Sequence, residues 1–117
     1  MSRFAPKLIS ALDCKSIVDA KLKFILSLCT PHQIFVFGSA ARNEMTDHSD
    51  VDLALIFIEE AELRAAREVV FRRSPGDEWP QDLLLYIKSD FERKKNTGGV
   101  CQLIAQEGIC IFERNKS

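Results

Sequence analysis

Two short apolar runs, joined by a small-residue turn and a polar loop, constrain this chain more than any other feature of its sequence. The runs cover residues 34–37 and 51–57, and a Gly-Ser pair at residues 38–39 directly follows the first. Both runs have the length and the branched and aromatic side chains of buried strands. Because side chains alternate along a strand, Asp50 and Asp52 point to the same side where the second run begins.

Two carboxylates in one small volume repel each other, and a divalent cation between them keeps both ionised. The alternative is an acidic loop whose side chains both lie in water, which is a common arrangement. Gly38 and Ser39 favour the cation, because glycine lets the backbone approach a phosphate closely and serine adds a hydroxyl donor. Arg42, in the short helical turn expected after Ser39, is a candidate for a further phosphate contact, although an arginine in such a turn is as often solvated.

Length and composition favour a single globular domain over residues 1–117. Apolar residues make up 46% and charged residues 28% of the chain, and its longest apolar stretch is far shorter than a membrane span. The first residues contain no continuous apolar segment of signal-peptide type, so a cytoplasmic location is expected. The net charge of −1 provides no basic field for nucleic acid. The four cysteines form no CxxC pair and are expected to be reduced and buried.

The periodicity of apolar residues, together with the positions of Gly and Pro, divides the chain into helices and strands. Apolar residues at spacings of three and four predict a first helix over residues 13–28, with Lys15, Lys21 and Lys23 among its exposed positions. Further helices are expected over residues 59–71, 89–95 and 100–106, and strands over residues 33–37, 51–57, 81–87 and 109–112.

A third carboxylate, Asp82, stands near the start of the third expected strand. If the strands are neighbours in one sheet, Asp50, Asp52 and Asp82 converge at one edge. Oxygen ligands of this kind suit Mg²⁺, which also binds substrate phosphates. Two such ions support nucleotidyl transfer, since one activates the attacking hydroxyl and the other neutralises the leaving phosphates. In this scheme Asp50 and Asp52 ligate metal, and Asp82 completes one site and assists deprotonation of the acceptor.

These residues resemble a known family. Gly38-Ser39, followed after ten residues by Asp50-Val51-Asp52-Leu53, is similar to the signature of the DNA polymerase beta-like nucleotidyltransferase superfamily, and the chain length is similar to its minimal (MNT-type) members. Gln81-Asp82-Leu83-Leu84 stands where the family places its third carboxylate, and residues 104–112 are similar to the helix-then-strand ending of minimal members. The resemblance implies an α+β fold, a small mixed β-sheet with helices packed on it.

Three positions depart from the family pattern. Ala40 and Asn43 stand where a Gly-Ser-Arg-Ala-Arg-Gly pattern has its first arginine and its last glycine. Asp82 follows Gln81, whereas the family usually has an apolar residue there. Asp77 and Glu78 therefore compete with Asp82 for the third carboxylate, and Asp82 is preferred because a strand fixes a ligand better than a Pro-Gly loop does.

The resemblance implies a nucleotidyltransferase that uses Mg²⁺, one ion or two, and ATP as the nucleotide donor. Gly38, Ser39, Arg42 and Ser49 are the candidates for nucleotide contact, and Ser49 alternatively caps the loop. The chain is too short for the helical acceptor domain of larger members, so the acceptor is expected to be a partner protein. For minimal members that partner is a small helical HEPN-type protein, a toxin whose tyrosine receives AMP from the antitoxin. The alternative is an inactive subunit that neutralises such a partner by occlusion, in a homo- or hetero-oligomer.

Overall fold

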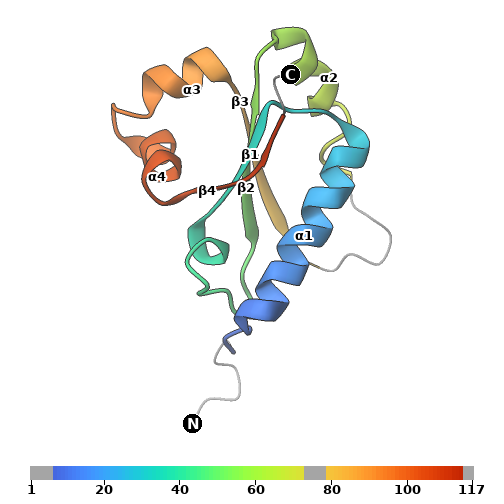
Figure 1. Cartoon of the computed structure of the whole chain (residues 1–117), viewed down its shortest axis with the longest axis vertical. Coiled ribbons are helices and arrows are strands. Elements are labelled where there is room, and N and C mark those ends of the chain that lie inside the picture. Colours follow the sequence, from blue (N-terminus) through green and yellow to red (C-terminus); the bar gives the residue numbers. More distant parts are fainter. Residues whose placement is uncertain (1–6, 73–78, 115–117) are drawn as a thin grey trace.

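A computed structural model of the chain describes residues 7–72 and 79–114, and its centre is a four-stranded sheet (Figure 1). The strand order is β3-β2-β1-β4. Strand β1 pairs antiparallel with both β2 and β4, whereas β2 and β3 are parallel. The expected α+β class with a small mixed sheet is therefore confirmed. The strands are β1 (Gln33–Phe37), β2 (Val51–Phe57), β3 (Gln81–Ile87) and β4 (Ile109–Glu113).

Helices cover both faces of the sheet. Figure 1 shows α1 and α2 on one side of the strands and α3 and α4 on the other. Three of the four predicted helices are found within two residues of their expected ends, but the second ends four residues early, before a set of hydrogen-bonded turns. Within the described ranges, none of these helices is long and apolar enough to cross a membrane. The helices are α1 (Ala11–Leu28), α2 (Glu60–Arg67), α3 (Lys88–Lys94) and α4 (Gly99–Glu107), with a 3₁₀ turn, η1 (Gly38–Ala40).

The sheet has an apolar core on each of its two faces, and strand β2 contributes side chains to both. Its odd-numbered residues, such as Leu53 and Leu55, pack with α1 and α2, whereas Ala54 and Ile56 pack with α3 and α4. Every residue from Leu53 to Phe57 is at most 1% exposed. A strand covered on both faces reads as a continuous apolar run, which is why this segment stands out in the sequence. Asp52 is the one polar residue of β2, near its first and less covered end.

The sequence prediction for α1 was wrong about the exposure of Lys21. It was expected to be exposed, but it is only 3% exposed, and its amine donates a hydrogen bond to the backbone carbonyl of Trp79. The buried residues of α1 are Cys14, Val18, Lys21 and Ile25, at spacings of four, three and four, so Lys21 lies on the buried stripe itself. Its hydrogen bond ties the segment before β3 to α1.

The four cysteines are free thiols, as expected, but they are not all buried. Cys14 and Cys101 are buried in the two cores, and Cys29 is partly exposed. Cys110 is exposed, because β4 is an edge strand and its first residues have little cover.

Candidate active site

The strand register brings two of the predicted carboxylates together. Asp52 and Asp82 are partners across the parallel strands β2 and β3, and each is the second residue of its strand. Partners in register share a face of the sheet, so both side chains leave it on the side of α3 and α4. Asp50 lies two residues before Asp52, immediately ahead of β2. All three carboxylates therefore gather at the end of the sheet where β2 and β3 begin.

The three carboxylates lie close enough to act on one another electrostatically. The pKa of Asp52 is raised above its ordinary value, first by burial, then by repulsion from Asp82 and from Asp50, while the positive charge of Arg42 opposes the rise. Asp52 is partly buried, whereas Asp50 and Asp82 are exposed. A cation at this point would remove the repulsion, because it favours the ionised form of every carboxylate near it.

The carboxylates are neighbours without forming a complete metal cage. In residues 7–72 and 79–114, no group of three or more His, Cys, Asp and Glu side chains is arranged to hold a metal ion. Mg²⁺ usually takes one or two protein carboxylates and completes its shell with water and substrate phosphates. The donor set therefore fits this cation, with Asp52 fixed by its strand and Asp50 and Asp82 exposed at the rim. Asp77 and Glu78, the alternative third carboxylates, lie outside the described residues.

Gly38 lies directly against the Asp52 carboxylate. The residue adopts φ +70°, and a Cβ atom placed there would be 2.2 Å from Asp52 Oδ2. Glycine is needed twice over at this position, because other residues rarely adopt that φ and because their side chains would displace the carboxylate. Phe37, the last residue of β1, is the partner of Asp52 across the sheet, which places the turn beside it. The Gly38-Ser39 turn and the carboxylates consequently form one site.

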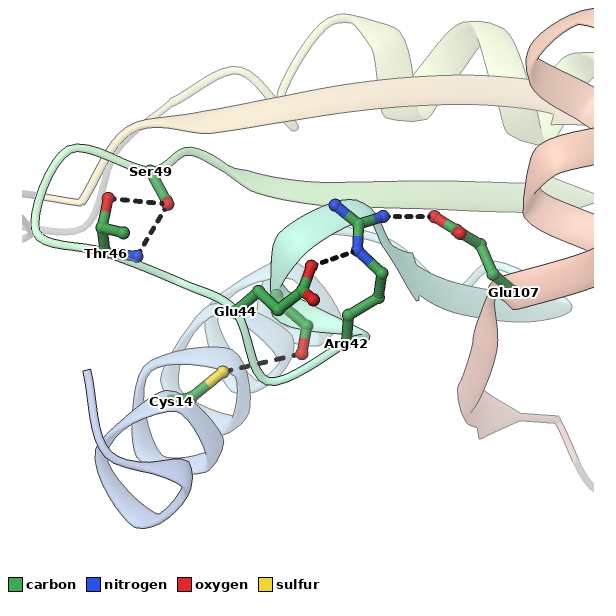
Figure 2. Close-up of polar contacts among 7 residues, drawn as sticks. Cys14, Arg42, Glu44, Thr46, Ser49 and Glu107 are labelled. Atoms are coloured by element: carbon green, nitrogen blue, oxygen red, sulfur yellow. Dashed lines mark hydrogen bonds and ion pairs between the residues drawn. The ribbon is translucent and has the colours of Figure 1, made fainter. Parts of the chain in front are cut away.

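Ala40 and Asn43, the two departures from the family pattern, both have local explanations. Ala40 is 7% exposed and packs into the core beside α1, where the Cys14 thiol donates to its carbonyl at 3.6 Å (Figure 2). An arginine side chain at this position would have to avoid that core. Asn43 adopts φ 55°, the left-handed region that asparagine tolerates better than most residues. Asn43 therefore adopts a backbone conformation that glycine also adopts readily.

Arg42 is exposed at the surface and takes part in two ion pairs. Its Nε donates to Glu44 Oε1 at 2.6 Å, and its Nη1 donates to Glu107 Oε1 at 2.8 Å (Figure 2). Glu44 is two residues away, whereas Glu107 is the last residue of α4. Sequence reasoning missed both acids, and for Glu107 the reason is that a contact across 65 positions leaves no local signal.

Ser49 makes its described contacts within the loop. Its Oγ accepts a hydrogen bond from the backbone N–H of Thr46 at 2.8 Å and lies 3.2 Å from Thr46 Oγ1 (Figure 2). This is the capping arrangement that the sequence offered as the alternative to nucleotide contact. It fixes the loop that leads into Asp50.

The comparison with protein families decides the affiliation of the chain. A family model described as "Polymerase beta, Nucleotidyltransferase" matches residues 20–117, which include the Gly38-Ser39 turn and all three carboxylates. This chain belongs to the polymerase beta nucleotidyltransferase family. No curated protein sequence matches the chain.

A solved structure shares the fold of this polymerase beta family member. It is a protein from Sulfolobus solfataricus, provisionally described as a nucleotidyltransferase, with 17% sequence identity and a TM-score of 0.55. The similarity covers 91% of this chain and 89% of that one. At 17% identity the likeness supports only the fold of the chain, and its chemistry has to be argued from the site residues.

The raised pKa of Asp52 predicts a stability effect that depends on pH. A carboxyl whose pKa is raised on folding binds its proton more tightly in the native state, so the protein loses stability as pH rises from the unfolded pKa through the folded one. We expect Asp52→Asn to raise the melting temperature in EDTA at pH 7, and the difference from the wild type to shrink towards pH 4. Asp19→Asn, at an exposed α1 position paired with Lys15, is the control and should change little. An equal effect of Asp52→Asn at both pH values would contradict the prediction.

The contact between Gly38 and Asp52 predicts a second effect. Gly38→Ala should lower the free energy of unfolding by roughly 1–2 kcal/mol from its φ alone, with a further loss from displacing the carboxylate. Gly99→Ala is the matched control, because Gly99 has φ +76° but nothing within 4 Å of a new Cβ. Urea unfolding should show the larger cost at Gly38. The excess over Gly99 should decrease in an Asp52→Ala background, and an unchanged excess would refute the contact.

Proposed function

We propose that the protein is a Mg²⁺-dependent nucleotidyltransferase that moves a nucleoside monophosphate, AMP from ATP, to a hydroxyl group of a partner protein. The observation that carries this proposal is the pairing of Asp52 with Asp82 in register, against the Gly38 turn, in a chain of this family. Acidic oxygens beside a backbone turn that a phosphate can approach closely are the two parts that this transfer needs.

Each residue has a distinct part in the proposed reaction. Asp50 and Asp52 would hold Mg²⁺, which when bound neutralises charge on the nucleotide phosphates. The backbone at Gly38 and the Ser39 hydroxyl would bind the terminal phosphates. Asp82 would accept the proton of the acceptor hydroxyl, whose oxygen forms the new bond to the α-phosphorus as the bond to the leaving pyrophosphate breaks.

We propose that the acceptor is a small helical protein of HEPN type and that the pair is a toxin and its antitoxin. The support is the resemblance of the sequence to minimal members of the family. It agrees with the fold, because the described helices all pack on the sheet and form no separate acceptor-binding domain in residues 7–72 and 79–114.

A second candidate is a binding subunit that neutralises its partner by occlusion, without catalysis. Two observations favour it. Ala40 replaces a basic residue of the family pattern, and the charge of Arg42 is already shared between two carboxylates. Both reduce the positive charge available to a nucleotide's phosphates.

The transferase proposal predicts nucleotide transfer that depends on metal and on Asp52. Incubation of the full chain and the candidate partner with labelled ATP and Mg²⁺ should label the partner, and EDTA should abolish the signal. Asp52→Asn should reduce labelling roughly 100-fold or more, since even groups around a metal's ligands are often worth 10–100-fold. Asp19→Asn should retain full labelling. Nucleotide transfer that persists in Asp52→Asn would refute the transferase proposal.

The two candidates separate in a neutralisation assay. Under occlusion, a variant carrying both Asp50→Asn and Asp52→Asn should still bind its partner and still neutralise it. Under catalysis, the same variant should bind the partner and fail to neutralise it. Co-purification measures the binding, and growth of cells that produce both proteins measures the neutralisation.

A further inference from the structure

We propose that Glu107 is a positioning residue that holds the Arg42 guanidinium at the nucleotide site. This inference rests on the proposed function, since it supposes that the site takes a nucleotide. Glu107 Oε1 accepts from Arg42 Nη1 at 2.8 Å, and the contact joins the end of α4 to the loop after the Gly38-Ser39 turn (Figure 2).

Glu107, and not Glu44, is the partner that can fix Arg42 in space. Glu44 belongs to the same loop as Arg42, and its side chain is 61% exposed, so it moves with the residue it contacts. The Glu107 side chain is 27% exposed and comes from a helix packed on the sheet. A contact to a rigid element restricts the arginine, whereas a contact within one loop does not.

The position of Glu107 is itself fixed by the core. Ile104, one turn earlier in α4, is fully buried, and its carbonyl accepts from the backbone N–H of Gly108 at 2.8 Å. A Cβ atom at residue 108 would be 2.4 Å from the Ile104 carbonyl oxygen, so this close turn requires glycine. Strand β4 begins one residue later, at Ile109, and pairs with Val36 of β1. The last residue of α4 therefore has little freedom to move.

The two ion pairs leave part of the guanidinium available. An arginine has five N–H donors in one plane, and Nε and one N–H of Nη1 are used by Glu44 and Glu107. Within the described residues, Nη2 makes no hydrogen bond, so its two N–H groups remain for an anion. The backbone N–H of Arg42 donates to the carbonyls of Gly38 and Ser39 at 3.3 and 3.2 Å, which places Arg42 beside the turn that lies against the Asp52 carboxylate. A planar donor held at one edge is suited to a phosphate at the other.

Holding the side chain in advance reduces what binding must order. An arginine that is free in solution loses rotamer freedom when it contacts a phosphate, and pre-ordering removes part of that loss. We therefore expect Glu107→Ala to weaken nucleotide binding by roughly three- to tenfold. Glu107→Gln keeps an oxygen acceptor for Nη1 and should recover part of the affinity. In transfer, the KM for ATP should rise while kcat changes little.

The test measures binding of a fluorescent ATP analogue to the full chain in MgCl₂. Glu62→Ala is the matched control, because Glu62 makes a comparable long-range pair with Arg114, at 3.6 Å, near the other end of β1. Glu62→Ala should bind as the wild type does. Melting temperatures of all variants show whether any change follows from lost stability alone.

A double-variant comparison tests whether Glu107 acts through Arg42. Glu107→Ala should have little further effect in an Arg42→Ala background, whereas a general weakening of α4 would reduce binding there as well. Unchanged or tighter binding by Glu107→Ala would overturn the inference, since tighter binding would mean that Glu107 competes with the phosphate. A wild-type protein that does not bind the analogue would overturn the proposed function itself, and the inference with it.

Discussion

The structure depends on β2 being buried from both sides. Helices α1 and α2 cover one face of this strand and α3 and α4 cover the other, so it supplies apolar side chains to two cores. Such a strand has no freedom to slip, because a shift of one residue would exchange the two sets of side chains. The pairing of β2 with β3 is fixed as a result, and with it the meeting of Asp52 and Asp82. The packing of the interior thus determines the geometry of the polar end.

The fold was largely readable from the sequence because its signals are local. Strand β2 is marked by a continuous apolar run, and helix α1 by apolar periodicity and by Pro31 after its end. The positions of the carboxylates were also readable, since Asp50 directly precedes a strand and Asp52 and Asp82 are each the second residue of one. The partners of Arg42 were not, because the Glu107 contact depends on where α4 ends after the whole sheet has formed. The burial of Lys21 was missed since charge suggests exposure, although its helical spacing marks the buried stripe.

Charge is unevenly distributed around the site. Three aspartates gather at the strand ends, and Glu44 and Glu107 add two more acids around Arg42. An anionic nucleotide would meet a negative surface here unless a cation accompanied it. Under the proposed function, the cation would have an electrostatic role in substrate capture as well as in the reaction, and the orientation of Arg42 would matter more than its charge alone.

The close approach of Gly38 to Asp52 also links the histories of these two positions. While the carboxylate is present, a side chain at residue 38 is excluded by contact as well as by backbone conformation. If a descendant lost the aspartate, the contact would disappear and only the milder backbone preference would remain. Substitution at residue 52 should therefore precede substitution at residue 38. A descendant that has lost the aspartate but keeps Gly38 would have lost the carboxylate recently, and one that has also replaced Gly38 would have lost it earlier.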